Sequence, residues 1–165
     1  MIDLTKLLVD GAVVTVVFAA MIAFAMLVQP RWFLSPKNIP TDILVMVPPQ
    51  TAAEKRNGRL ALLPFMLALL CLLAWSLWGV AQGEQGFLGL FAHTFGLLLM
   101  PFLFDLLIID WLVMNTWTPD FVGFPGTEGF AGYKDYAFHA RAHLRGLPGL
   151  TVFSAILAGL FTIIV

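Results

Sequence analysis

Charged side chains are scarce in this 165-residue sequence: Asp, Glu, Lys and Arg together make up only 12% of it. An ordinary soluble domain carries about 25% charged residues. Hydrophobic residues reach 60%, and the mean hydropathy is +0.91. A protein with so little polar surface cannot cover its core in water. The composition therefore excludes an ordinary soluble domain and indicates an integral membrane protein.

Two further shortages exclude other classes of protein. Nine basic residues against ten acidic ones give a net charge of −1. No basic stripe is present to neutralise phosphates, so we expect no nucleic-acid partner. Cys71 is the only cysteine, which excludes a disulfide within the chain and leaves the redox compartment undetermined.

What the sequence does contain is four long apolar segments, at about residues 8–29, 60–82, 86–114 and 148–165. Each is close to or above the length that a helix needs to cross a bilayer, about 20 residues. The first is too long for the apolar part of a signal peptide, so we expect a retained membrane helix. The sequence thus predicts an all-α integral membrane protein, a single domain over residues 1–165 built as a four-transmembrane-helix bundle.

Basic residues are distributed unevenly around these segments. Eight of the nine lie in the two long connections, 30–59 and 115–147, whereas the N-terminal tail has only Lys6. Because Lys and Arg concentrate in cytoplasmic loops, we place both long loops in the cytoplasm and both termini outside. We further expect a bacterial inner membrane, membrane lipids as partners, and cytoplasmic loops through which a homo-oligomer or a protein partner would bind.

The first long connection contains five prolines, which exclude a long helix. Residues 42–47 are apolar and predict either a short strand or a segment that rests on the membrane surface. Thr51 followed by Glu54 matches a capping box, which predicts the start of a short helix. We interpret this connection as a structured interfacial connector. The alternative is a lid over the second long connection.

The third apolar segment carries two aspartates, Asp105 and Asp110. A carboxylate inside the hydrocarbon costs roughly 2.5–3.5 kcal/mol, so we expect a partner, which is a proton, a basic residue or a metal ion. We therefore assign both as candidate catalytic residues. On an α-helix, positions five apart differ by about 140°, so the two form a pair only through a local distortion. His93, in the same segment, is expected to bond to Thr94 or to a neighbouring helix.

The second long connection ends in three residues spaced four apart: Asp135, His139 and His143. On a helix they share one stripe, and a carboxylate with two neutral imidazoles can bind a divalent ion such as Zn²⁺ or Fe²⁺. We expect a short interfacial helix near residues 131–145. The alternative is that the stripe is only the polar face of that helix. Further acidic residues that could complete the ligand set are Asp105, Asp110, Asp120 and Glu128.

A Gly/Pro-rich stretch, residues 119–129, precedes this stripe and contains a Pro-Gly turn signal. Its backbone N–H groups, together with Arg141 and Arg145, predict a binding site for a phosphate such as a lipid head group. We count Glu128 with them as a binding residue. The alternative is a compact turn between two helices.

Two classes of function remain open, and the sequence does not decide whether the protein is an enzyme. The first is a small polytopic membrane protein with a polar, metal-binding site at the cytoplasmic leaflet, acting on a lipid or other hydrophobic substrate. The alternative is a small oligomeric transporter, or a proton- or cation-coupled assembly subunit, that uses Asp105. We favour the first because polar residues gather at one face, whereas the other apolar segments supply almost none.

Overall fold

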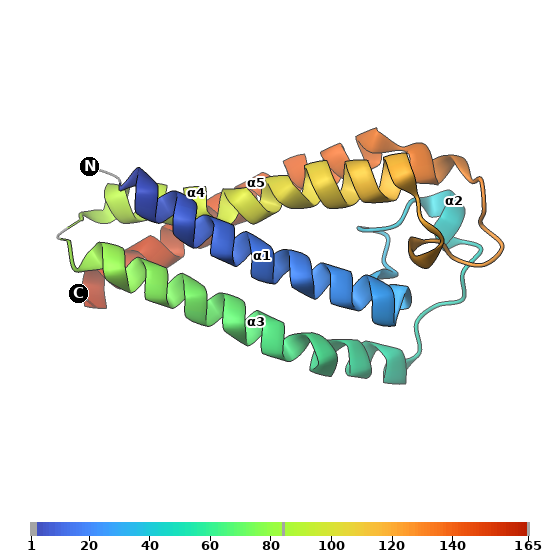
Figure 1. Ribbon diagram of the computed structural model, residues 1–165, viewed down its shortest axis with the longest axis horizontal. Coiled ribbons are helices and arrows are strands. Elements are labelled where there is room, and N and C mark those ends of the chain that lie inside the picture. Colours follow the sequence, from blue (N-terminus) through green and yellow to red (C-terminus); the bar gives the residue numbers. More distant parts are fainter. Residues whose placement is uncertain (1–2, 84, 165) are drawn as a thin grey trace.

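Four long helices dominate the computed structural model, which describes residues 3–83 and 85–164. They are α1 (Leu4–Val28), α3 (Ala52–Ala81), α4 (Phe87–Phe104) with its continuation η2 (Asp105–Trp117), and α5 (Tyr136–Ile164). In Figure 1, α1 lies between α3 and α4, and α5 runs alongside α4. The start of α1 and the end of α5 lie near the α3–α4 connection, and the two long connections lie at the opposite end.

The outer surface of these helices is apolar. All four are long and apolar enough to cross a membrane, and no more than a third of any apolar window is buried inside the protein. Large side chains such as Leu67, Trp75, Leu88 and Val152 are exposed. A soluble monomer rarely exposes apolar surface on this scale, whereas a bilayer accommodates it. The prediction of four apolar helices is confirmed, and the arrangement suggests a membrane protein.

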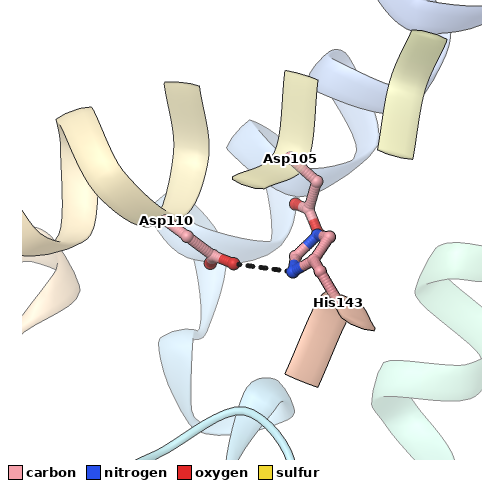
Figure 2. A group of neighbouring side chains, drawn as sticks. All are labelled: Asp105, Asp110 and His143. Atoms are coloured by element: carbon pink, nitrogen blue, oxygen red, sulfur yellow. Dashed lines mark ion pairs between the residues drawn. The ribbon is translucent and has the colours of Figure 1, made fainter. Parts of the chain in front are cut away.

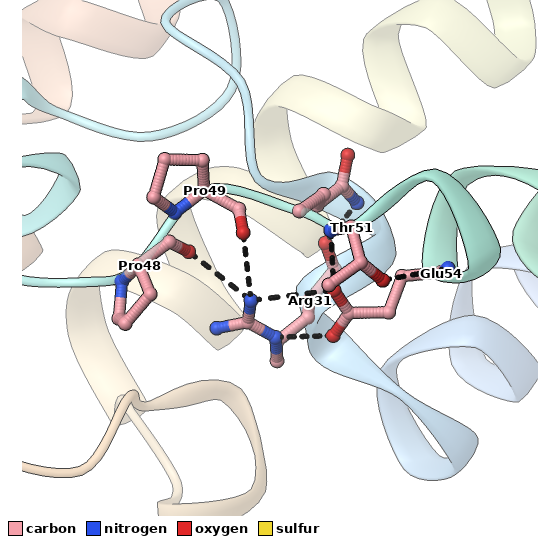
Figure 3. A network of polar contacts seen from close by, with 6 residues as sticks. Arg31, Pro48, Pro49, Thr51 and Glu54 are labelled. Atoms are coloured by element: carbon pink, nitrogen blue, oxygen red, sulfur yellow. Dashed lines mark hydrogen bonds and ion pairs between the residues drawn. The ribbon is translucent and has the colours of Figure 1, made fainter.

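The capping box at the start of α3 is confirmed. Thr51 Oγ1 accepts from Glu54 N at 3.1 Å, and the Glu54 carboxylate accepts from Thr51 N at 2.7 Å (Figure 3). The helix that it opens is not short, however, because it continues through Pro64 to Ala81. Uninterrupted apolar sequence after Arg59 lets the capped turn and the predicted span join into one helix.

A polar network joins the end of α1 to the start of α3. Arg31 follows α1, and its Nε donates to Glu54 Oε1 at 2.6 Å. Its Nη2 donates to the carbonyl of Pro48 at 3.1 Å (Figure 3). Between these points the chain forms the short helices η1 (Pro30–Phe33) and α2 (Thr41–Leu44). Of the two interpretations of residues 42–47, the strand is therefore wrong, since the segment begins as a helical turn. Its position on the membrane surface stays a prediction.

The two long connections pack against each other. Asp42 Oδ2, at the start of α2, accepts from the backbone N–H of Gly132 at 2.8 Å. Gly132 belongs to η4 (Ala131–Lys134), and a side chain there would collide with Asp42. Four buried apolar residues form a small core between the connections: Ile39, Ile43, Phe124 and Tyr133. The lid interpretation of the first connection stays a prediction.

The helix α5 is continuous over 29 residues, so the expected short interfacial helix near 131–145 and separate span from 148 are wrong in that detail. Pro148 lies inside α5 without ending it. The physical reason is the packing of α5 along α4: a Cβ added to Gly146 would lie 3.3 Å from the Phe102 ring, so glycine permits close approach. Because the helix is continuous, its first turns lie beside the last turns of the α4–η2 helix.

Candidate functional site

Asp105 and Asp110 lie on a π-helical stretch, η2, that continues α4. In a π-helix each backbone bond joins residues five apart, and such segments are rare and frequent at functional sites. The bond from Thr118 N to Val113 O at 2.8 Å has this spacing. The wider turn brings a residue and the fifth residue after it much nearer one face than an α-helix does. The two carboxylates therefore point to the same side, and η2 supplies the local distortion that α-helical spacing lacks.

The first turns of α5 bring two histidines to these carboxylates. His139 Nδ1 lies 3.1 Å from Asp110 Oδ2. His143 Nε2 lies 3.5 Å from Asp105 Oδ2, and its Nδ1 lies 3.6 Å from Asp110 Oδ2. Figure 2 shows the His143 ring between the two carboxylates. The structure thus unites residues that the sequence placed on separate elements: the two aspartates and the two histidines.

The ring of His143 is held in a defined orientation. Its Nδ1 is 3.1 Å from the carbonyl oxygen of His139, which can only accept, so Nδ1 carries the proton. Nε2 is then the ring nitrogen that faces Asp105 Oδ2. The Phe102 ring meets the imidazole edge-on, with centroids 4.6 Å apart. Only 12% of the His143 side chain is exposed, so this geometry is fixed by packing as well as by bonds.

The donor atoms are close enough to share a divalent cation. One atom each from Asp105, Asp110 and His143 lie within 4.8 Å of one another. Ligands at about 2.1 Å from a tetrahedral zinc are separated by about 3.4 Å, close to the observed 3.5 Å from His143 to Asp105. A neutral imidazole bonded through its other nitrogen to a backbone carbonyl is a common arrangement for metal ligands. Carboxylate oxygens with imidazole nitrogen suit Zn²⁺ or Fe²⁺.

A cavity of about 260 Å³ reaches this cluster. Asp105, Asp110, His139 and His143 all line it. The facing wall comes from α1 and the first connection and is mainly apolar, with members that include Phe18, Ile22, Met26, Phe33 and Ile39. The exposed Lys37 and Asn38 also line the cavity. A polar cluster beside an apolar wall is the usual composition of a small-molecule site.

Asp135 lies in a different environment from the other two members of the predicted stripe. Its Oδ1 accepts from the backbone N of Phe138 at 2.8 Å, as a helix N-cap does at the start of α5. Its Oδ2 is 3.5 Å from Arg141. The structure therefore groups His139 and His143 with Asp105 and Asp110. The assignment of Asp135 as a metal ligand stays a prediction. The sequence signal for its capping role is an aspartate directly before a helix.

The predicted binding residues lie on the surface. Hydrogen bonds from its own backbone N–H and from that of Gly126 hold the pKa of the Glu128 carboxyl below its ordinary value. Arg141 is engaged with Asp135, and Arg145 Nε donates to the Arg141 carbonyl at 3.2 Å. Asp120, a further candidate ligand, is exposed. Phosphate binding by Glu128, Arg141 and Arg145 stays a prediction.

The C-terminal end of η2 is held by residues that precede α5. Lys134 Nζ donates to the carbonyl of Asn115 at 2.7 Å and to the Thr118 hydroxyl at 3.0 Å. A cation is favourable at a helix C-terminus, where carbonyls lack partners. Asn115 Nδ2 donates to the Tyr133 carbonyl at 3.0 Å. These bonds fix the position of α5 relative to η2, and therefore that of both histidines relative to both aspartates.

A second polar cluster lies at the other end of the bundle, and sequence reasoning missed most of it. Asp10 of α1 bonds to Lys6 and to Ser76 of α3. Ser76 in turn bonds to His93 of α4, so the expected contact of His93 with a neighbouring helix is observed. Thr94 bonds instead to its own helix, at Leu90 O. One sequence signal could have pointed to this cluster: Lys6 and Asp10 are oppositely charged and four residues apart at the start of an apolar helix.

No protein-family model, curated protein or solved structure matches the chain. Its class is defined by the fold and the site. It is an all-helical protein over the described residues 3–83 and 85–164, with four helices long and apolar enough to span a membrane. Between η2 and α5 it carries a cluster of two aspartates and two histidines.

Proposed function

We propose that this chain is a membrane-embedded metal-binding protein whose site acts on a lipid or another hydrophobic substrate. The observation that carries the proposal is the convergence of Asp105, Asp110 and His143, with ligand atoms within 4.8 Å of one another. His139 joins them through its contact with Asp110. Buried or half-buried carboxylates in an apolar helix need a partner, and a divalent cation would neutralise two of them together.

Each residue has a role in this proposal. Asp105 and His143 would bind the ion through Oδ2 and Nε2, and Asp110 would bind it from the next turn of η2. His139 would hold the Asp110 carboxylate in place. A bound divalent ion would supply Lewis-acid polarisation and a more acidic water. A carboxylate oxygen that is not bound to the ion would then accept or return a proton at the substrate.

The apolar wall of the cavity supports a hydrophobic substrate. Phe18, Ile22 and Met26 of α1 line the cavity together with the polar cluster. A substrate with an apolar body would contact this wall while its polar group reached the aspartates and histidines. We propose that it enters from the cytoplasmic leaflet, since the basic residues of both long connections favour that side. We also propose a bacterial inner membrane as the location, with both termini outside.

The transport alternative gains support from the second polar cluster. Asp10, Ser76 and His93 come from three helices, so polar groups are not limited to one face of the bundle. An apolar layer that includes Val14, Leu73 and Leu97 lies between the two clusters. Because the residues that pack together in that layer are apolar, we keep metal-assisted chemistry as the first proposal.

Metal analysis of the purified, lipid-reconstituted protein tests the proposal. We expect about one divalent ion per chain after exposure to zinc or iron, and loss of the ion in His143→Ala and in Asp110→Asn. The ion should also leave as the pH falls, because the ligands bind only when deprotonated. A matched control is Asp135→Asn, since asparagine also caps helices and this residue lies outside the cluster.

Metal that is absent from the wild type, or present and unaffected by both ligand variants, would overturn the site. Loss of the ion in Asp135→Asn together with retention in Asp110→Asn would instead favour the stripe of Asp135, His139 and His143. Circular dichroism and size-exclusion profiles of each variant show whether the fold is kept.

A further inference from the structure

The cluster formed by Lys6, Asp10, Ser76 and His93 is built from three helices, and its members other than Lys6 are buried. Asp10 is 6% exposed, Ser76 is fully buried, and His93 is 1% exposed. Lys6 Nζ lies 2.7 Å from Asp10 Oδ2, and Ser76 Oγ lies 2.5 Å from the same oxygen. Ser76 Oγ also lies 2.9 Å from His93 Nε2. A continuous chain of hydrogen bonds therefore runs from α1 through α3 to α4.

The directions of these hydrogen bonds follow from the number of protons available. The Asp10 carboxylate can only accept, so the single hydroxyl proton of Ser76 is donated to it. Ser76 Oγ must then accept from His93, which means that Nε2 carries a hydrogen. In the neutral ring the remaining nitrogen, Nδ1, has a lone pair and is the atom that can gain a proton.

The charged side chains near His93 have a net negative charge, which favours the binding of that proton. Among the described residues, Asp3 directly before α1 and Lys6 and Asp10 within it are the charged side chains of this helix end, and they sum to −1. Among the described residues, α3 has no titratable side chain next to Ser76, and α5 has none after Arg145. A proton on His93 would bring the total charge of this group to zero. The imidazolium would be stabilised by Asp10 through the Ser76 hydroxyl.

His93 is also reached by a cavity, and apolar residues lie between its cluster and the Asp105 cluster. A cavity of about 220 Å³ at the α3–α4 connection is lined by His93 together with Asp3, Lys6 and Gln85. One helical turn further toward the Asp105 end, Val14, Leu73 and Leu97 pack together in a buried apolar layer. His93 therefore meets a cavity on the side of the α3–α4 connection and apolar side chains on the side of the Asp105 cluster.

We propose that His93 is a proton-binding site, linked through Ser76 to Asp10 and open to the side of the membrane opposite the Asp105 cluster. One proton from water forms a bond to Nδ1, and no other covalent bond changes. The binding of this proton is independent of a metal at Asp105, so the two proposals can fail separately.

Nuclear magnetic resonance of ¹⁵N-histidine-labelled protein in lipid nanodiscs tests the proposal. The signals of His93 are identified by their loss in His93→Gln. We expect a neutral ring with hydrogen on Nε2 at high pH that becomes doubly protonated in one step between about pH 9 and pH 4. Asp10→Asn should lower the midpoint by about one pH unit, because it removes the negative charge that favours the imidazolium.

Two further variants complete the test. Ser76→Ala should also lower the midpoint of His93 protonation, because it breaks the hydrogen-bonded path to Asp10 while Asp10 and Lys6 stay in place. This variant provides the test if Asp10→Asn does not fold. Thr94→Val is the matched control, since Thr94 is buried beside His93 but bonds only to Leu90 O. A ring that keeps one protonation state over the whole range would overturn the proposal. So would a midpoint that is the same in wild type, Ser76→Ala and every folded Asp10 variant.

Discussion

His143 and His139 make different contacts, and the difference predicts different contributions to metal binding. His143 presents Nε2 to Asp105 and binds a backbone carbonyl through Nδ1, as a ligand does. His139 is buried and directs Nδ1 at Asp110 from 3.1 Å, within hydrogen-bond distance. We therefore treat His139 as a positioning residue for the Asp110 carboxylate.

Removal of the His139 ring should weaken metal binding without abolishing it. His139→Ala is expected to raise the dissociation constant about 10–100-fold, the usual range for a partner that orients a ligand. His139→Asn keeps a donor near the position of Nδ1 and should recover most of the affinity. Isothermal titration with zinc measures both. Equal loss in the two variants, at the level of His143→Ala, would show that His139 is itself a ligand.

The geometry of the candidate site depends on how closely the helix α5 packs along the helices α4 and η2. Gly146 of α5 faces the Phe102 ring, and Phe102 in turn contacts the His143 imidazole. Gly149, three residues further on in the same helix, has no atom within 4 Å of an added Cβ. The two glycines thus offer a test of packing that leaves every proposed ligand in place.

Gly146→Leu should push α5 away from α4 and separate the histidines from the aspartates. Overpacking of this kind costs about 1–3 kcal/mol, so we expect a lower unfolding temperature and weaker zinc binding. Gly149→Leu should change neither, because its side chain would extend into open space. Thermal unfolding and zinc titration of both variants give the comparison. Equal behaviour of the two would contradict the packing described between Gly146 and Phe102.

Local signals in the sequence predicted much of the helical structure. Long apolar runs identified four helices, and Thr51 with Glu54 identified the start of α3. The pairing of Asp105 with Asp110 could not be predicted, because it depends on a π-helical turn, and apolar sequence carries no mark of that hydrogen-bond spacing. The sequence also did not predict that α5 continues through Pro148, since proline tends to interrupt a helix and packing against α4 outweighs that tendency.

The polar contacts of the second cluster show a similar limit. Lys6 and Asp10 stand four apart, so their ion pair could be expected on a helix. The contribution of Ser76 could not, because a serine in an apolar helix usually bonds to its own backbone. Only the packing of α1 against α3 and of α1 against α4 brings Ser76 between Asp10 and His93.

The whole molecule is polar at its two ends and apolar between them. The Asp105 cluster lies toward the end with the long connections, and the Asp10 cluster lies toward the chain termini. Basic residues concentrate in the long connections, which led us to place that end in the cytoplasm. On this topology the two clusters would meet different aqueous compartments.

Labelling of single cysteines in intact cells tests this orientation. In a Cys71→Ala background, a membrane-impermeant maleimide should label Gln85→Cys from outside. It should label Glu128→Cys only after the cells are opened. Glu128 is exposed in the second long connection, so a lack of labelling in intact cells would not reflect burial. Labelling of position 128 from outside, with protection of position 85, would reverse the topology.

X-ray absorption at the zinc edge of the reconstituted protein tests the central claim most directly, because it reports the atoms bound to the ion. We predict a shell of nitrogen and oxygen at about 2.0–2.2 Å with the outer-shell scattering of imidazole. Imidazole scattering should decrease in His143→Ala and persist in Asp135→Asn. A shell of oxygen alone, as in a hydrated ion, or a spectrum identical in wild type and His143→Ala, would contradict a metal site at Asp105, Asp110 and His143.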